Sequence, residues 1–523
     1  MMHIDPRDTD VNSTRSSVDN VAYVVEQKDM PSSHRSPPRQ CNDMLFLIAF
    51  LAVAGMTVAF AVQFGPKFIQ ETQLRDNPDT TGFKKVLNYA AMCGGASIGI
   101  SLAWIVTMMF LGEFVIWASL FFMIGACVFA GIFMTKKLHE REAKVYWWPA
   151  PVFGLLALLI TLYAVCIRKR VKFAAVHLKI ASNAIFRLPM TLIVALVMVV
   201  VQLAWAITWF LGVYGLFDHL EYIKPNHHCA DPYSAAKCKL HVKYGPIVGL
   251  SVPMLAVFFW GAMVVKNIVA VTVAGTVAAW KVNVSTPLIT LGAWGRAMTL
   301  SLGSICFGSL VVAILEAIQT VLNSISMVAA RSGNCVAACI VGCLACCLGC
   351  IKNMVETFNR YAYAYVGIHG ISFLKAGRQV SQLFHSKGWT GVVNDDLTQK
   401  VFWLGNLVVG GLTSFVAVTV VADQVENQSF QFPGVKRPEY MVGVVAFLIG
   451  YIVNNLFMSV MGGAVTTIFV LWAEDPLGWS LTQPKHYAAL HNAWLRIYPN
   501  EYNHGQGGSP PSELGSKPHA MPA

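Results

Sequence analysis

The sequence predicts an all-α fold, a polytopic transmembrane bundle of about ten helices. Hydrophobic residue types make up 55% of the 523 residues and charged types only 12%, whereas a soluble domain carries about 25% charged residues. Apolar runs recur along the chain, and most approach the ~20 residues that cross ~30 Å of hydrocarbon. Lys and Arg outnumber Asp and Glu by 38 to 27, and much of this excess lies between the apolar runs. These observations exclude an ordinary soluble enzyme and a disordered protein.

Ten apolar segments are candidate spans. They are residues 44–66, 88–111, 113–134, 148–167, 190–214, 246–274, 297–321, a segment within 336–374, 401–422 and 440–472. We expect a tight turn at 112–113 to join the second and third spans. The last segment is long for a single crossing, so we expect a break or a tilt at 454–455 or at 462–463.

The basic segment 168–189 sets the expected orientation. It carries six Lys and Arg and no acidic residue, and it follows the fourth span. Cationic segments stay on the cytosolic side, and an even number of spans puts both ends of the chain on one side. Both termini are therefore expected in the cytosol. The apolar residues of this segment recur at helical spacing, which predicts a helix in the membrane interface.

This topology divides the chain into three regions. Residues 1–43 are expected to form a disordered cytosolic tail, residues 44–480 the membrane domain, and residues 481–523 a cytosolic tail that is mostly flexible.

Two features of the outer loops are candidate modification sites. The loop 215–245 holds Cys229 and Cys238. We expect a disulfide between them in an oxidising compartment, with two free thiols as the alternative. Asn427 begins an Asn-x-Ser sequon and is a candidate glycosylation site.

No catalytic signature is present in the sequence, which has no P-loop, HExxH zinc helix or GxSxG nucleophile elbow. We therefore expect no enzyme activity and no cofactor. Zinc sites usually take ligand pairs from separate loops, whereas here a single cysteine-rich segment is present. We interpret it as a packing or acylated helix, with a metal site or redox control as alternatives. Its members, five of which share one helical face, are Cys335, Cys339, Cys343, Cys346, Cys347 and Cys350.

Polar side chains inside the spans are candidates for function, because their burial in lipid is costly. One interpretation is a polar path across the bilayer. The alternative is hydrogen bonding between helices, including an ion pair between Lys266 and Glu316. The candidates are Lys266 in the sixth span, Glu316 and Gln319 one turn apart in the seventh, Asn359 in the eighth, and Asn454 and Asn455 in the tenth.

Aromatic side chains form a second group of candidates. Aromatic faces attract quaternary ammonium ions by cation–π contact, worth about 2 kcal/mol when desolvated. The alternative for each tryptophan is a packing residue or an interfacial anchor. The candidates are Trp260 and Trp280 in or beside the sixth span and Tyr361 and Tyr365 in the eighth.

Four segments also carry a family resemblance. Residues 335–384 have the cysteine-rich stretch, then FNRYAY, then G-x-x-F-x-x-x-x-R. The other three are VAGTVAAW at 273–280, LGSICFGSL at 302–310 and AVTTIFVLWAEDP at 464–476. Together and in this order they resemble the signature of the choline transporter-like family. The short segment 67–85 after the first span resembles the fungal and protist branch of that family.

The resemblance implies a multi-pass transporter for choline or related ammonium compounds such as ethanolamine. The expected mechanism is alternating access coupled to protons. The coupling candidates are then Glu316, the one carboxylate well inside the seventh span, and Lys266. The substrate-binding candidates are Trp260, Trp280, Glu316, Gln319, Asn359, Tyr361, Tyr365 and Asn455.

The expected partners are a choline-like small cation and membrane lipids, with no nucleic acid. The expected location is the plasma membrane, with an organellar membrane as the alternative. The alternative function is a non-transporting, membrane-organising or lipid-handling protein of the same family.

Overall fold

The computed structural model describes residues 41–75, 80–140, 149–219, 223–224, 241–242, 244–284, 286–387, 398–426 and 438–497. Nearly all of them are helical, which confirms the predicted fold class. The helices are α2 (Met44–Arg75), α3 (Thr80–Glu140), α4 (Pro149–Arg187), α5 (Met190–His219), α6 (Tyr244–Lys281), α7 (Pro287–Met298), α8 (Leu302–Arg331), α9 (Cys335–His369), α10 (Phe373–Ser386), α12 (Thr398–Glu426), α13 (Pro438–Glu474), α14 (Pro476–Thr482) and α15 (Pro484–Ile497). Strands β1 (Ile223–Lys224) and β2 (His241–Val242) form an antiparallel pair.

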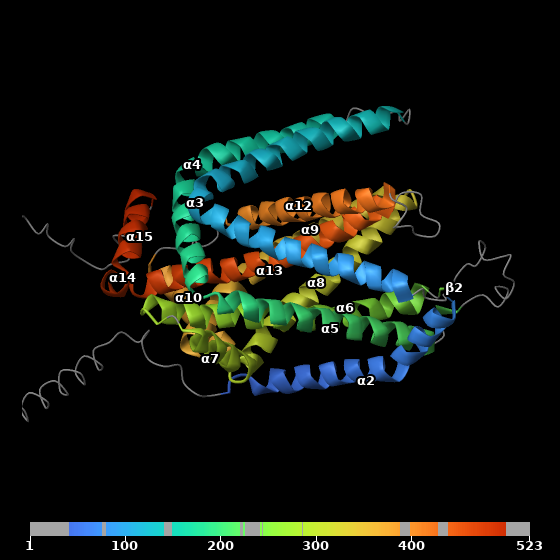
Figure 1. Cartoon of the computed structure of the whole chain (residues 1–523), viewed down its shortest axis with the longest axis horizontal. Helices are drawn as coiled ribbons and strands as arrows, with labels where there is room; N and C mark the ends of the chain where they lie inside the picture. The colour runs from blue at the N-terminus through green and yellow to red at the C-terminus, as the bar shows by residue number, and fades with distance from the viewer. Residues whose placement is uncertain are drawn as a thin grey trace, which may run out of the picture.

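Nine helices in the described ranges are long and apolar enough to cross a membrane. The apolar part of α3, Met92–Lys136, has 45 residues, or about 68 Å at 1.5 Å per residue, which is twice the hydrocarbon thickness. The helix leaves helical geometry at Leu111, where φ is −117° and ψ is 27°, and Figure 1 shows α3 turning back on itself. The nine helices can therefore supply the ten crossings that the sequence predicts. The turn expected at 112–113 is instead a kink within one helical element.

The helix α4 has two parts with different surroundings. Its first part, Ala150–Arg168, is a candidate span. Figure 1 shows α4, in teal, then changing direction and running across one end of the bundle. This second part buries Val171 and Leu178 and exposes Lys172 and Lys179. The amphipathic helix predicted at 168–189 is therefore present, and α13 and α15 pack against α4.

The last membrane helix, α13, is one continuous helix of 37 residues. The break expected at 454–455 or at 462–463 is absent from it. At 1.5 Å per residue the helix is about 56 Å long, so it extends well beyond a ~30 Å hydrocarbon layer. Its final turns carry Trp472 and Glu474 to the end of the bundle.

Three long helices end together at one side of the molecule. α6 ends at Lys281, α9 at His369 and α13 at Glu474, and ion pairs described below join these ends. We call this side the junction end; it is at the left of Figure 1, with the short helices α7, α10, α14 and α15. The described chain also starts there and finishes there.

Small residues let α6 and α9 approach closely near the junction end. A Cβ atom on Gly367 would lie 2.6 Å from the Cβ of Ala274 and 2.6 Å from the carbonyl oxygen of Val271. No side chain can occupy that space, so the two backbones are in direct contact. Close approach through small residues is a common way for helices to associate in lipid, because the hydrophobic effect does not drive helices together there.

The residues just before α2 are fixed to the junction end by polar contacts. Asn42 donates its side-chain amide to the carbonyl oxygen of Gly370 at 3.0 Å. Asp43 accepts a hydrogen bond from the Ser304 hydroxyl at 2.6 Å and from the backbone N–H of Phe373 at 3.0 Å. The Asp43 carboxylate thus satisfies a free N–H at the start of α10, as a capping residue does.

The helix α15 packs on α4 and α13 through a buried aromatic cluster. Trp494 is fully buried, and its ring lies 5.0 Å from that of Phe173 and 5.5 Å from that of Phe469. His177 lies in the same cluster, with Nδ1 3.0 Å from the carbonyl oxygen of Phe173. Part of the tail expected from residue 481 is therefore this packed helix. Residues 1–40 and 498–523, which make up most of the two expected tails, lie outside the described residues.

The contact between α6 and α9 can be tested at its glycine. Because Gly367→Ala places a methyl group against Ala274 and the carbonyl of Val271, we expect it to lower the free energy of unfolding by about 1–3 kcal/mol. Thermal unfolding of the purified protein in detergent measures this change. Gly99→Ala in α3 is the control, since a Cβ there meets nothing within 4 Å. Equal stability of the two variants would contradict the proposed close contact.

The buried histidine predicts a dependence of stability on pH. Burial lowers the pKa of His177 from 6.5 to about 4. Between these values the unfolded chain binds a proton that the folded protein excludes, so stability falls as the pH drops from about 6.5 to about 4. We expect His177→Leu to reduce the loss between pH 7 and pH 5 by on the order of 2 kcal/mol.

Unfolding temperatures at pH 7, 6 and 5 test this expectation. His385→Leu is the matched control, because His385 is exposed on α10. A pH profile of His177→Leu identical to that of the unmodified protein would show that the burial of His177 does not govern acid sensitivity.

Candidate functional site

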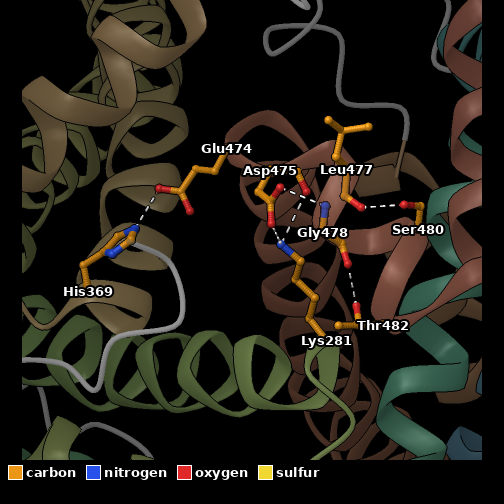
Figure 2. A network of polar contacts seen from close by, with 8 residues as sticks. All are labelled: Lys281, His369, Glu474, Asp475, Leu477, Gly478, Ser480 and Thr482. Atoms are coloured by element: carbon orange, nitrogen blue, oxygen red, sulfur yellow. Dashed lines mark hydrogen bonds and ion pairs between the residues drawn. The ribbon is translucent and has the colours of Figure 1, made fainter. Parts of the chain in front are cut away.

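The junction end brings together charged groups from the C-terminal ends of three membrane helices. The C-terminal end of a helix carries a partial negative charge, because its last carbonyl groups have no intrahelical partner. Lys281 and His369 are the final residues of α6 and α9, so one cation and one titratable base are placed where that charge favours them. Figure 2 shows both side chains facing Glu474, the last residue of α13, and Asp475, which follows it.

The first ion pair joins α6 to the segment between α13 and α14. Lys281 Nζ lies 3.1 Å from Asp475 Oδ2, and the two side chains are only 2% and 14% exposed. The other oxygen of Asp475 accepts the backbone N–H of Gly478 at 2.8 Å, which caps α14. The Lys281 ammonium also lies 5.9 Å from the ring centroid of Trp479. One half-buried carboxylate therefore fixes both the end of α6 and the start of α14.

A second polar contact joins α9 to α13. His369 Nε2 lies 2.7 Å from Glu474 Oε1, and the Tyr365 ring lies one turn away, tilted by 45° and with its centroid 4.4 Å from that of the His369 ring. The second oxygen of Glu474 is buried and has no hydrogen-bond partner among the described residues. This carboxylate oxygen beside an aromatic ring has the chemistry that attracts an ammonium group.

Trp280 belongs to the junction end but is engaged in packing. Its side chain is 2% exposed, and its ring centroid lies 6.2 Å from that of Trp479 and 5.5 Å from that of His486. Its carbonyl oxygen accepts a hydrogen bond from the Gln483 side chain at 3.2 Å. In this conformation Trp280 anchors α14 and the start of α15 to the end of α6.

Trp260 lies in a different part of the bundle. It donates its indole N–H to the carbonyl oxygen of Cys306 at 2.9 Å, and its ring meets that of Phe50 edge-on at 5.3 Å. Twenty residues separate it from Trp280 on the same helix, or about 30 Å. The aromatic residues that the sequence singles out thus do not form one cage in this structure.

A polar cluster joins α6, α8 and α9 within the bundle. Asn359 donates its amide to the carbonyl oxygen of Gly308 at 3.0 Å. Ser309 accepts the Asn267 amide at 2.9 Å, and its hydroxyl lies 3.2 Å from that of Tyr363. Asn267, Ser309 and Tyr363 are absent from the predicted site, although Ser309 and Tyr363 lie within the FGS and FNRYAY motifs. Those motifs are the signal that could have identified them.

Glu316, the carboxylate predicted for proton coupling, does not pair with Lys266. Glu316 Oε2 lies 2.6 Å from Lys352 Nζ, with side chains that are 24% and 17% exposed. Lys266 is exposed on α6, so the considered Lys266–Glu316 pair is replaced by a pair between α8 and α9. Gln319 lies beside it, over Gly349, where a Cβ would be 2.7 Å from the Gln319 amide nitrogen.

The remaining two candidates face other helices. Tyr361 packs with its ring 5.1 Å from that of Phe384 and 6.1 Å from that of Phe469, toward α10 and α13. Asn455 is exposed and accepts the amide of Asn406 at 3.1 Å. Asn406 in turn accepts the amide of Asn454 at 2.8 Å. The three asparagines join α12 to α13 and lie apart from the junction end.

Several predicted features concern residues outside the described ranges. Cys229, Cys238 and Asn427 all lie there, so the disulfide and the glycosylation site stay predictions. Of the cysteine-rich segment, Cys339, Cys343, Cys346, Cys347 and Cys350 are exposed on α9. Within the part of the chain that the structure describes, no group of three or more His, Cys, Asp and Glu residues could hold a metal ion.

The long apolar helices define a multi-pass integral membrane protein. The chain belongs to the plasma-membrane choline transporter family, whose family model matches residues 151–477, more than half of the chain. The match covers the polar cluster of α6, α8 and α9 and includes Lys281, His369, Glu474 and Asp475.

Curated relatives agree with this assignment. Protein PNS1 of Mycosarcoma maydis is 30% identical over 354 residues, which cover 64% of this chain and 62% of the relative. Protein PNS1 of Cryptococcus neoformans var. neoformans serotype D (strain JEC21) is 25% identical over 506 residues, covering 91% and 86%. A CTL-like protein of Dictyostelium discoideum is 25% identical over 373 residues, covering 70% and 58%. The chain thus spans less than two thirds of the Mycosarcoma and Dictyostelium relatives.

The buried ion pair at the junction end gives a direct test of its structural role. Lys281→Met leaves the Asp475 carboxylate buried without its cation, so we expect the free energy of unfolding to fall by about 3–5 kcal/mol. The double variant Lys281→Met, Asp475→Asn removes both charges and is expected to recover part of this loss. Thermal unfolding in detergent measures both values.

Lys485→Met is the control for this test, because Lys485 is exposed on α15 at the same end. Equal unfolding temperatures for the single and double variants would show that the lone carboxylate is not what destabilises the protein.

Proposed function

We propose that this protein transports choline or a related ammonium compound across the membrane by alternating access, with the junction end as one of its gates. The observation that carries this proposal is the pair of ion contacts, Lys281–Asp475 and His369–Glu474, between the ends of three membrane helices in a member of the choline transporter family. Ion pairs between helix ends can break and form again without unfolding any helix. They are suited to hold one state of a moving bundle.

The chemistry of this end favours a cation. The C-terminal ends of α6, α9 and α13 contribute partial negative charge, and Glu474 and Asp475 add two carboxylates. The second oxygen of Glu474 makes no hydrogen bond among the described residues, and His369, which contacts the first oxygen, lies against the ring of Tyr365. An ammonium substrate that reaches this end can compete with His369 for Glu474, which would open the contact between α9 and α13. Tyr365 and Trp280 are the aromatic residues placed to contact such a substrate.

Proton coupling is assigned in this proposal to Glu316. The Glu316–Lys352 pair lies between α8 and α9, within the apolar windows of both helices. Protonation of Glu316 would remove its charge and release Lys352, so the contact between the two helices would depend on pH. Lys266, exposed on α6, would be a second cation along the same route.

The remaining assignments follow the family. We place this protein in the plasma membrane with both ends of the chain, and therefore the junction end, in the cytosol. The basic second part of α4 at that end agrees with the excess of Lys and Arg on the cytosolic side of membrane proteins. Trp260, Gln319, Asn359, Tyr361 and Asn455 would then position the helices that move, rather than form one cage.

Uptake of radiolabelled choline by the purified protein in sealed proteoliposomes tests the proposal. We expect saturable uptake that ethanolamine competes with and that a pH gradient increases. In Glu316→Gln the gradient-driven part should fall about tenfold, the change produced by ~1.4 kcal/mol of lost interaction. Glu356→Gln, one turn beyond Lys352 on α9, is the matched control and should retain the pH response.

Two results would contradict the proposal in distinct ways. No uptake above empty vesicles by folded protein would remove choline transport, and lipid movement in the same vesicles would then support the lipid-handling alternative. Uptake in Glu316→Gln with an unchanged pH response would remove only the role of Glu316.

A further inference from the structure

A hollow opens at the junction end between α6, α7 and α9. It is open to solvent rather than enclosed. Its floor is the close contact between α6 and α9 at Gly367, and the start of α8 closes one side. Small and apolar groups form most of its wall, and the polar side chains in it are Arg296 and Ser301.

Arg296 is a partly buried cation with no carboxylate partner in the described part of the chain. The ion pairs there join Lys281 to Asp475, Lys352 to Glu316 and His369 to Glu474. Burial lowers the pKa of Arg296, and no neighbouring charge acts on it. A Cβ atom on Gly275 would lie 3.4 Å from one guanidinium nitrogen, so the side chain lies along the wall of the hollow. A guanidinium held in this way without a counter-ion is costly unless an anion binds it.

Ser301 adds a second donor to the lining of the hollow. It is the N-cap residue of α8, but its side chain makes no capping hydrogen bond, and the residue is only 5% exposed. The start of α8 also carries partial positive charge, part of which is offset by the Asp43 carboxylate bound to the Ser304 hydroxyl of the same turn. Two independent features, the guanidinium and this helix start with its hydroxyl, therefore favour negative charge in the hollow.

The nearest carboxylate does not fill this role. Asp43 is held by the Ser304 hydroxyl and by the backbone N–H of Phe373, and it forms no ion pair with Arg296 at 4.0 Å or less. The lining of the hollow contains the Arg296 guanidinium and no acidic side chain. It is therefore a different site from the carboxylates of Glu474 and Asp475, which are proposed above to attract an ammonium group.

We propose that this hollow binds a phosphate group, carried either by a lipid headgroup or by a soluble phosphate compound. The planar fork of Arg296 donates two parallel hydrogen bonds to phosphate oxygens, and Ser301 donates a third. The exposed apolar side chains Leu288 and Leu291 on α7, 76% and 37% exposed, supply a surface on which acyl chains of a bound lipid can lie. This site does not depend on the proposed transport activity.

Thermal unfolding of the full-length protein in detergent tests the site with inorganic phosphate as the probe. Phosphate is titrated against chloride at constant ionic strength, so that general salt effects cancel. We expect a saturable rise in the unfolding temperature. In Arg296→Gln the apparent Kd for phosphate should rise about tenfold or more, because a charge-assisted hydrogen-bond pair is lost.

Two further variants keep the test decisive. Arg296→Lys retains the charge but not the fork, so it should bind phosphate with intermediate affinity. Lys375→Gln removes an exposed cation from α10 at the same end and should bind phosphate like the unmodified protein. If Arg296→Gln does not fold, Arg296→Lys and Ser301→Ala carry the comparison. Equal phosphate affinity in the unmodified protein and all Arg296 and Ser301 variants would overturn the proposal.

Nanodiscs distinguish the two sources of phosphate. The protein is reconstituted in phosphatidylcholine alone or with added phosphatidic acid, and free phosphate is then titrated. If phosphatidic acid raises the unfolding temperature and blocks the effect of free phosphate only when Arg296 is present, the ligand is a lipid headgroup. If free phosphate acts equally in both membranes, the ligand is a soluble phosphate. No effect of either one would overturn the site.

Discussion

A polar side chain within hydrocarbon must find its partner inside the protein, and this constraint fixes how α8 and α9 pair. Glu316 meets Lys352, Gln319 lies over Gly349, and the carbonyl of Gly308 accepts from Asn359. All three contacts have the same antiparallel register. Shifting either helix by one turn would leave a charge and several hydrogen-bonding groups without partners. This register positions both the polar cluster and the C-terminal end of α9.

The junction end is a consequence of that arrangement. Once α9 is fixed, His369 lies beside Glu474, and Gly367 brings α6 close enough for Lys281 to reach Asp475. Because Asp475 also caps α14, the packing of the short terminal helices depends on the same carboxylate. A change in one ion pair would therefore reach α6, α13 and α14 together. This coupling supports the proposal that the junction end is a gate.

The two proposed ligand sites lie at the same end of the bundle but favour opposite charges. Helix C-terminal ends and carboxylates surround the Glu474 region, whereas the hollow presents Arg296 and the N-terminal end of α8. Opposite helix ends meet at one side of the bundle because α8 runs antiparallel to α6 and α9. The same topology that creates a place for an ammonium group therefore also creates one for a phosphate.

The sequence by itself determined the membrane-crossing segments, because each must hold about 20 apolar residues whatever surrounds it. It also determined the amphipathic second part of α4 and the family motifs. Only the tertiary structure decided which side chains meet. The membrane helices are apolar on nearly all sides, so periodicity does not reveal which face meets a neighbour. That is why Lys352 rather than Lys266 pairs with Glu316, and why Trp260 and Trp280 lie far apart. The sequence predicts a turn at 112–113, but only the structure shows that α3 continues through it as one helical element with a kink at Leu111.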